Sequence, residues 1–559
     1  MKRIFALILA LTMMVTAAAF ASAETTMPIV EEPITMTMMI GLDTSRGYDP
    51  ADNAVFKYLE EVTNIHWDFI VVDRSSWTER LSLMWASGDM PDMIYNGVSG
   101  NDLLLYTGTL ILDLKPYLEE YAPNFWNLYQ NNADVRLAVD LPTGKIGSFV
   151  WTNMEIEAGA GQCPNEILYI NQQWLDALGL EMPQTVDEYY ETLMAFRDKD
   201  PNGNGEADEI PMIGSHNAWN GYFDEMIINY FTYYNTDYML GVEDDVVYAP
   251  FVTEEWQEAM IYMNKLVSEG LLSDLSFTMT LDEMVSMIQS YPPEEQILGF
   301  IVGIPVHTFP DPSTTSILAY DAVPPFEDAY TPERTANVTK YAFITADCEH
   351  PEIAFRLFDY FAQERVSLIT RYGEPGVHFM YRADDPEAFD AMFPNATQAA
   401  MSLGWEPIYA EMPGVVNPWV EESNAIWAVH MCCMLPAITY GSQGTTTPAD
   451  EFVTSWQEGV ERGDVQAHRD YLNANSLKWL GQLPEQLFVD PIYTLEEMDM
   501  YNNTINTVKE YVRECIAAFA TGAMDPVNDW DAYLASLDAA GLQDWLDVAQ
   551  AYWDRSHAA

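Results

Sequence analysis

Basic residues are scarce in this chain of 559 residues, which has 24 Lys and Arg against 86 Asp and Glu and a formal net charge of −62. A surface this negative repels phosphate backbones and anionic lipids, so no nucleic-acid partner is expected. It also disfavours polyanionic substrates, unless a local basic pocket receives them. The excess of acid alone is typical of a soluble protein from a salty or acidic habitat, and it argues mildly for a neutral ligand.

Cysteine is also rare, and motifs that mark enzymes are missing. The five cysteines are an odd number, widely scattered, and include no Cys-x-x-Cys pair, so neither a disulfide framework nor a zinc site is indicated: Cys163, Cys348, Cys432, Cys433 and Cys515. The chain contains no nucleophile elbow, zincin motif, phosphate loop or dinucleotide fingerprint. Among 86 acidic residues some carboxylate pair exists by chance, so their abundance is not evidence for glycoside hydrolysis. No residue is therefore assigned a catalytic role.

Long apolar runs are missing except at the N-terminus. Lys2 and Arg3 precede the apolar stretch 4–20, and Ala21-Ser22-Ala23 is a small-residue cleavage site. This pattern predicts a signal peptide over residues 1–23, and hence export, rather than a permanent membrane span.

Alternating strand and helix patterns follow the signal peptide. Strands expected at 35–42, 65–72 and 92–95 are separated by helices at 54–62 and 77–85, which is typical of an open α/β sheet with parallel neighbours. A second block of the same kind begins near residue 166. Its expected strands are 167–170 and 297–302, and its expected helices are 185–196, 254–269 and 281–289, the first with a capping box from Thr185 to Glu188. A strand at 340–346 and a helix at 351–362 could return the chain to the first block.

This order predicts two lobes without a flexible linker, and crossover strands that serve as a hinge beside a cleft. The expected division is 24–150 for the first part of lobe 1, 151–335 for lobe 2, 336–410 for the return to lobe 1, and 411–559 for a mostly helical part shared between the lobes. Gly522 and Gly541 are expected to break the helices of this last part.

One loop has the composition of a cation site. In the run from Asp200 to Glu209, oxygen-bearing residues recur at every second position, with Gly203 and Gly205 between them. Calcium takes six to eight oxygen ligands from tight loops of this kind. The position that holds a glutamate in an EF-hand is occupied here by Pro211, so the loop is not an EF-hand. A plain turn rich in Asn and Gly is the alternative.

Several stretches resemble one protein family. The segment 83–94 contains Ala-Ser-Gly-Asp-x-Pro-Asp, 112–118 reads Leu-Asp-Leu-Lys-Pro-Tyr-Leu, 171–200 leads into the cation loop, and 373–378 ends in Gly-Val-His. Together with the tail 530–542, these segments resemble bacterial extracellular solute-binding proteins, the receptors of ABC importers. The likeness is to the carbohydrate type, in the oligosaccharide- and alginate-binding and LipO-like branch, and it covers nearly the whole mature chain.

The resemblance implies a class II periplasmic-binding-protein fold, in which two α/β lobes close on a ligand and pass it unchanged to a membrane permease. It also implies one structural Ca²⁺ in the loop, held by the side chains of Asp200, Asn202, Asn204, Asp208 and Glu209 and by the main chain of Glu206. A monomer is expected. Relatives in Gram-positive bacteria usually have a lipobox cysteine at the cleavage site; this sequence has none, so periplasmic, secreted and signal-anchored forms all stay open.

Ligand contacts are expected on loops at strand ends and on the crossover strands, where aromatic faces stack on sugars and polar groups bind hydroxyls. His216 lies in one such loop. The candidates are Tyr95, Asn96, Trp151, Asn153, Trp219, Asn220, His378, Tyr381 and Trp405. For each aromatic, packing in the core is the alternative. An exported glycoside hydrolase and a surface lectin remain rival functions, and peptides or sugar phosphates remain possible cargo.

Overall fold

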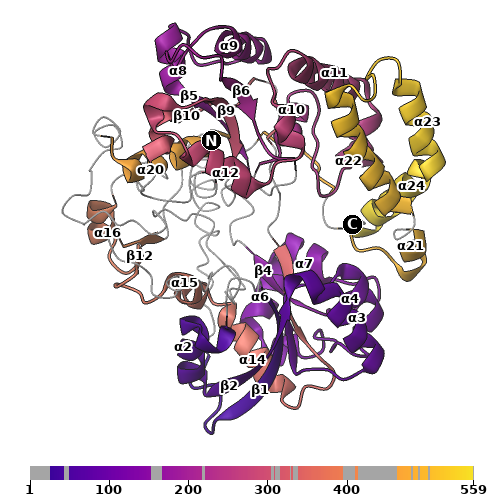
Figure 1. Cartoon of the computed structure of the whole chain (residues 1–559). Helices are drawn as coiled ribbons and strands as arrows, with labels where there is room; N and C mark the ends of the chain where they lie inside the picture. Colours follow the sequence, from indigo (N-terminus) through magenta and orange to yellow (C-terminus); the bar gives the residue numbers. More distant parts are fainter. Residues whose placement is uncertain are drawn as a thin grey trace, which may run out of the picture.

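The structure is a computed structural model, and it contains two α/β lobes with a helical C-terminal part (Figure 1). It describes residues 25–42, 49–152, 166–216, 221–303, 308, 315–327, 329–331, 338–393, 409–412, 463–479, 482–488, 491–500 and 504–557. The predicted signal peptide, residues 1–23, lies outside this part of the chain.

The first lobe is built on a five-stranded sheet of order β2-β1-β3-β11-β4. β1 pairs in parallel with β2 and β3, whereas β11 is antiparallel to both of its neighbours, β3 and β4. The strands are β1 (Ile34–Leu42), β2 (Ile65–Asp73), β3 (Met93–Tyr95), β4 (Phe149–Thr152) and β11 (Val338–Ile344). The parallel α/β pattern predicted for the first block is confirmed, and the strand predicted at 340–346 joins this same sheet.

Both faces of this sheet are covered, which explains why β1 reads as a nearly continuous apolar run. Alternate side chains of a strand point to opposite faces. Met38 and Ile40 accordingly belong to one buried cluster, while Met39 belongs to another. The helices of this lobe are α2 (Ala54–Thr63), α3 (Trp77–Ser87), α4 (Gly100–Tyr106), α5 (Leu118–Tyr121), α6 (Pro123–Asn131), α7 (Ala133–Val139), α14 (Pro351–Phe361) and α15 (Glu364–Tyr372).

The second lobe is built on a four-stranded sheet of order β10-β5-β9-β6. β9 is antiparallel to β5 and parallel to β6. Its strands are β5 (Ile167–Asn171), β6 (Ile210–Ile213), β9 (Leu298–Gly303) and β10 (Tyr320–Ala322), and its helices are α8 (Gln172–Leu178), α9 (Val186–Asp198), α10 (Phe223–Ile228), α11 (Glu254–Ser268) and α12 (Leu281–Gln289). Gly299 of β9 is required by packing, because a Cβ there would lie 2.6 Å from the ring of Phe196.

The capping prediction for α9 is correct in one half. The Thr185 hydroxyl accepts from the N–H of Glu188, as predicted, but the Glu188 carboxylate accepts from the N–H of Gln184 rather than Thr185. A complete capping box is found instead at the N-terminus of α12, between Thr280 and Glu283.

The C-terminal helices extend the core of the second lobe. They are α20 (Val465–Ser476), α21 (Leu495–Met500), α22 (Asn506–Thr521), α23 (Trp530–Ala540) and α24 (Leu542–Ser556). α22 packs on α11, where Asn264 donates to the carbonyl of Phe519 at 2.8 Å, and Trp545 of α24 stacks on Phe251. Gly522 and Gly541 end α22 and α23 in the left-handed conformation, so both predicted breaks are confirmed.

Two small antiparallel pairs complete the described strands: β7 (Gly241–Glu243) with β8 (Val246–Tyr248), and β12 (Phe379–Tyr381) with β13 (Tyr409–Glu411). Helix α16 (Pro386–Met392) follows β12. In Figure 1, β12 and α16 lie to one side of both sheets.

A buried carboxylate joins distant parts of the first lobe. Asp359 on α14 accepts hydrogen bonds from the backbone N–H groups of Asn124 and Phe125, at 2.7 and 3.0 Å, and so caps the start of α6. These bonds favour the ionised form, but burial opposes it more strongly and raises the pKa of Asp359 to about 6.

We therefore predict that Asp359 makes the fold less stable as pH rises. The folded-state pKa lies above the unfolded one, so ionisation of Asp359 costs more in the folded protein. The stability of the wild type relative to Asp359→Asn should fall by up to about 3 kcal/mol between about pH 4 and pH 7, measured by urea unfolding. A relative gain with rising pH would show that the hydrogen bonds from α6 outweigh burial.

Candidate functional site

The two sheets face each other with the edges at which the carboxyl ends of their strands lie. β4 runs in the same direction as β1, β2 and β3, because β11 is antiparallel to both β3 and β4. The carboxyl ends of these strands therefore share one edge, and from that edge β4 leads the chain towards the second lobe. In the second sheet, β5 enters where β9 ends, with Ile167 opposite Gly303, so the carboxyl ends of β9 and β6 face the edge of entry.

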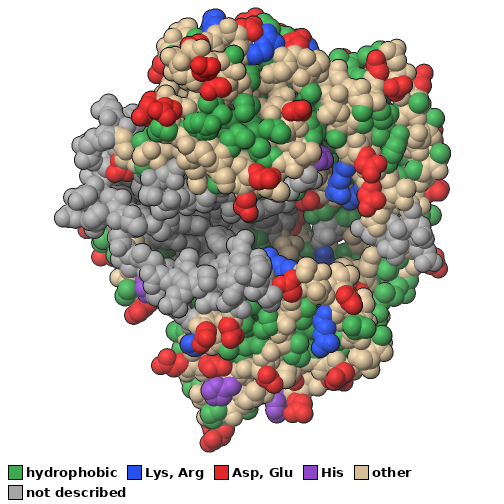
Figure 2. Space-filling model, viewed as in Figure 1, with side chains coloured by type: hydrophobic (Ala, Val, Ile, Leu, Met, Phe, Trp, Pro, Cys, Tyr) green, Lys and Arg blue, Asp and Glu red, His purple; other side chains and the backbone are tan. Residues whose placement is uncertain are grey.

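Ligands of open α/β sheets bind outside the carboxyl ends of the strands. The facing carboxyl edges are therefore the candidate binding site. Figure 2 shows acidic side chains spread over both lobes, while the few basic ones include some along the rims where the lobes face each other.

Trp77 lies at the edge of the first sheet and was missed by the sequence prediction. It begins α3, shortly after β2, and its indole N–H donates to the carbonyl of Gly97 at 2.8 Å. The ring covers two glycines, since a Cβ on Gly41 would lie 3.0 Å from it and a Cβ on Gly97 only 2.3 Å. Gly97 also has a φ of +75°, which disfavours any other residue. The half-buried indole is thus held as a fixed aromatic plate.

The two residues predicted at the end of β3 have different fates. Tyr95 is only 2 % exposed and packs edge-on against Tyr341, with ring centroids 4.9 Å apart. This environment matches core packing, the alternative given for Tyr95, and its role as a ligand contact stays a prediction. Asn96 is half-buried at the edge itself, with φ +70°, and its N–H donates to the carbonyl of Tyr341.

Trp151 is half-buried on the crossover strand β4, opposite Thr339 of β11. Its place where the chain crosses between the lobes stays a prediction. The other candidates from neighbouring loops, Asn153, Trp219, Asn220 and Trp405, lie outside the described residues.

His216 lies at the carboxyl end of β6, on the edge of the second sheet. Its Nδ1 is 2.8 Å from Oδ2 of Asp224 on α10, and the side chains are 16 % and 2 % exposed. The charge of Asp224 raises the pKa of His216, against the opposing effects of burial and of Arg513. A buried carboxylate that fixes Nδ1 leaves Nε2 as the ring nitrogen available to a ligand.

His378 and Tyr381 lie apart from both sheet edges, in the small unit formed by α15 and β12. His378 Nδ1 accepts from the N–H of Glu374 at 2.8 Å, and burial lowers the pKa of His378. The Tyr381 hydroxyl donates to Glu364 and its ring lies beside Arg365. Asn96, Trp77 and Trp151 lie at the edge of the first sheet, and His216 lies at the edge of the second. His378 and Tyr381 lie at neither edge.

The predicted cation loop follows α9 and is mostly exposed. Amide groups of Asn202 and Asn204 donate to Asp208, and the N–H of Gly205 donates to Asp200 at 3.0 Å. Gly203 and Gly205 have φ +70° and +80°, as the predicted wrap requires. Among the described residues, no three His, Cys, Asp or Glu side chains are grouped as a metal site.

Glu209 shows how the loop could still accept a cation. Its Oε1 is buried, and no hydrogen-bond donor in the described part of the chain reaches it. Burial, with the charges of Asp208 and Asp200, raises the pKa of Glu209. Rotation of the Asn202 and Asn204 amides would turn their oxygens inward, and such orientations are assigned from hydrogen bonds alone. The donor set therefore fits a hard divalent cation.

A model of the family described as "Bacterial extracellular solute-binding protein" matches residues 44–366, more than half of the chain. The chain belongs to this family. No helix in the described residues has the length and apolar character that a bilayer crossing requires.

Individual relatives match nearly the whole length of this solute-binding protein. The fructooligosaccharide ABC transporter substrate-binding protein FusA of Streptococcus pneumoniae is 24 % identical over 95 % of this chain and 92 % of its own. Its structure with kestose has a TM-score of 0.68 at 21 % identity, covering 94 % of this chain and 100 % of that one. An extracellular solute-binding protein of Bifidobacterium longum subsp. infantis reaches 0.71 at 20 % identity, covering 94 % and 98 %. These likenesses confirm the predicted two-lobed fold.

Two related structures concern a metal. One is an EF-hand mutant of FusA with fructo-nystose, with a TM-score of 0.68. The other is the alginate-binding protein AlgQ2 without calcium ion, with a TM-score of 0.63 at 19 % identity, covering 94 % of this chain and 99 % of that one.

The His216–Asp224 pair should stabilise the fold in a pH-dependent way. Because the folded-state pKa of His216 is raised, the ion pair contributes fully below the ordinary histidine pKa of about 6.5, and this contribution is lost as pH rises through the folded value. Asp224→Asn should therefore lower the free energy of unfolding more at about pH 6 than at about pH 9. His216→Gln and the double variant complete the cycle, and a coupling energy equal at both pH values would contradict the assignment.

Proposed function

We propose that this solute-binding protein captures an oligosaccharide between the facing carboxyl edges of its two sheets and delivers it to the permease of an ABC transporter. The main support is the geometry of the edges, which place a fixed aromatic plate on one lobe and an oriented imidazole on the other. FusA, which is named for fructooligosaccharides, has the same fold and covers nearly the whole chain.

The chemistry of the two edges suits a sugar. The C–H face of a sugar ring packs on an indole, and Trp77 offers one whose position is fixed by two glycines and a hydrogen bond. His216, whose Nδ1 is held by Asp224, presents Nε2 as a hydrogen-bonding partner for a sugar hydroxyl. Closure of the lobes would bring both groups onto one ligand and exclude water, which strengthens the hydrogen bonds. Asn96 and Trp151 are further candidates for contact.

Nothing in these contacts requires a chemical step. The named relatives are binding proteins, and we propose that this protein likewise binds without turnover. A glycoside hydrolase would release product from the same sugars, and mass spectrometry of the recovered ligand separates the two functions. The family is extracellular, and we propose export through the signal peptide over residues 1–23.

We predict that Trp77→Ala weakens binding at least about tenfold, the loss of about 1.4 kcal/mol expected when an anchoring aromatic is removed. Kestose, nystose and neutral milk oligosaccharides would first be screened by thermal shift, and the best of them titrated by calorimetry. Leu83→Ala, on the exposed face of the same helix, is the control and should bind as wild type. Equal affinity of Trp77→Ala and wild type would remove the indole from the site.

We also propose that the loop 200–209 holds a structural Ca²⁺ through Asp200, Asn202, Asn204, Asp208, Glu209 and the main chain of Glu206. The buried, unpartnered Oε1 of Glu209 supports this assignment. The ion would neutralise neighbouring carboxylates and tie the end of α9 to the start of β6.

We predict that two glutamates of this loop differ in their effect on Ca²⁺ binding. Glu209→Gln should weaken Ca²⁺ binding at least about tenfold, since it removes a ligand charge. Glu206→Gln should bind as wild type, because only its main chain is a ligand. Calcium titration of chelator-treated protein, followed by calorimetry and melting temperature, checks both. If the two variants behave alike, the ligand assignment is wrong.

A further inference from the structure

Two neighbouring residues are buried in the cores of different lobes. Ile492 is 5 % exposed and belongs to the apolar cluster of the first lobe that contains Trp85, Leu103 and Phe343. Tyr493 is 3 % exposed and belongs to the large cluster of the second lobe and the C-terminal helices, where it meets the ring of Tyr552. The segment is not part of either sheet.

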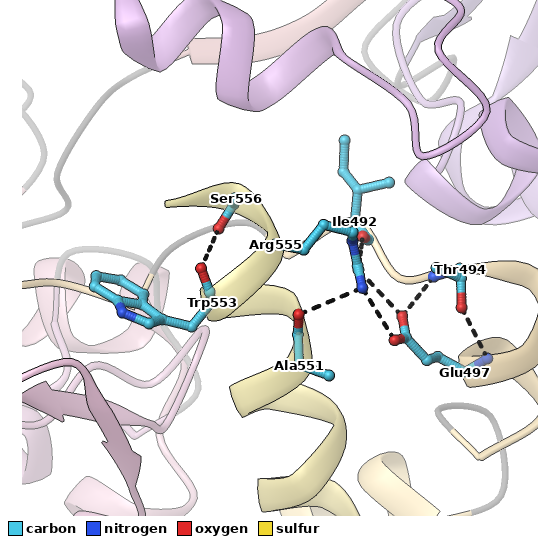
Figure 3. A network of polar contacts seen from close by, with 7 residues as sticks. All are labelled: Ile492, Thr494, Glu497, Ala551, Trp553, Arg555 and Ser556. Carbon is cyan, nitrogen blue, oxygen red and sulfur yellow. Dashed lines mark hydrogen bonds and ion pairs between the residues drawn. The ribbon is translucent and has the colours of Figure 1, made fainter. Parts of the chain in front are cut away.

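A network of charged and capping contacts holds Ile492 and Thr494, the residues on either side of Tyr493 (Figure 3). Arg555 of α24 binds both carboxylate oxygens of Glu497, at 3.1 and 3.2 Å, and also donates to the carbonyl of Ile492 at 3.3 Å. Glu497 in turn accepts from the N–H of Thr494 at 2.6 Å, and Thr494 accepts from the N–H of Glu497. The carboxylate is 16 % exposed, so this bidentate pair is better shielded from solvent than a surface ion pair.

The burial of both residues limits how the lobes can move. Consecutive Cα atoms are about 3.8 Å apart across a trans peptide bond, whatever the other backbone angles. The lobes therefore cannot separate at this point unless Ile492 or Tyr493 leaves its core. α21, which follows directly, also contacts α4 of the first lobe.

We propose that Ile492 and Tyr493, locked by Arg555 and Glu497, form a clasp that acts as a pivot between the lobes. A point that is held in both rigid bodies allows rotation about itself but prevents the lobes from sliding apart there. The clasp limits the range of open states and so favours the approach of the two carboxyl edges.

The test needs no ligand, so it stands whether or not the proposed cargo is correct. Spin labels are placed at Leu83 on α3 and Ile261 on α11, which are 57 % and 39 % exposed. They are attached through an unnatural ketone side chain, because the protein has five cysteines. Pulsed electron resonance then gives the distribution of interlobe distances in the full-length protein.

Ile492→Ala should broaden this distribution at least about twofold, because one end of the clasp is released. Leu495→Ala is the matched control: it removes the same kind of side chain from an exposed position three residues away and should leave the distribution unchanged. Arg555→Gln, which leaves both cores filled, should also broaden it. If circular dichroism shows that Ile492→Ala does not fold, Arg555→Gln serves as the test variant. A folded variant of either kind with the wild-type distribution would overturn the proposal.

Discussion

The pairing of β4 with β11 is the constraint on which the rest of the structure depends. Two segments that are almost two hundred positions apart in sequence lie side by side as the chain leaves the first lobe and returns to it. This pairing fixes the direction of β4 relative to β1 and β3, and so decides which edge of the first sheet faces the second lobe. Trp77, Asn96 and Trp151 all lie at the edge of the first sheet that this topology sets.

Each group of the site is held in place by other parts of its own lobe rather than by the other groups of the site. Trp77 is held by the backbone of β1 and of the turn after β3, and His216 by a carboxylate buried at the start of α10. In the proposed site, each lobe thus carries its own rigid half, and closure would change only the relative position of the halves. The chain has a net charge of −62, so its surface repels anionic ligands. A neutral ligand suits such a site because no broad basic surface is needed to bind it.

Local patterns predicted the elements well, and non-local contacts account for what was missed. The apolar runs of β1 and β9 and the amphipathic faces of α9 and α12 are visible in the sequence, and their positions were predicted to within a few residues. Trp77 was not recognised, because its role depends on Gly41 and Gly97 becoming neighbours through the pairing of β1 with β3. The packing of Tyr95 could not be predicted for a related reason: only the presence of Tyr341 on β11 shows that its ring is buried. The clasp had no signal, since Ile492 and Tyr493 look like any apolar pair.

The central claim is that two rigid lobes close around a sugar. Small-angle scattering of the protein with and without the oligosaccharide that shifts its melting temperature most tests this directly. The account predicts a smaller radius of gyration in the bound state, with the ligand recovered intact. An unchanged radius of gyration at saturating ligand would contradict it, because a site divided between two lobes cannot be completed without their approach.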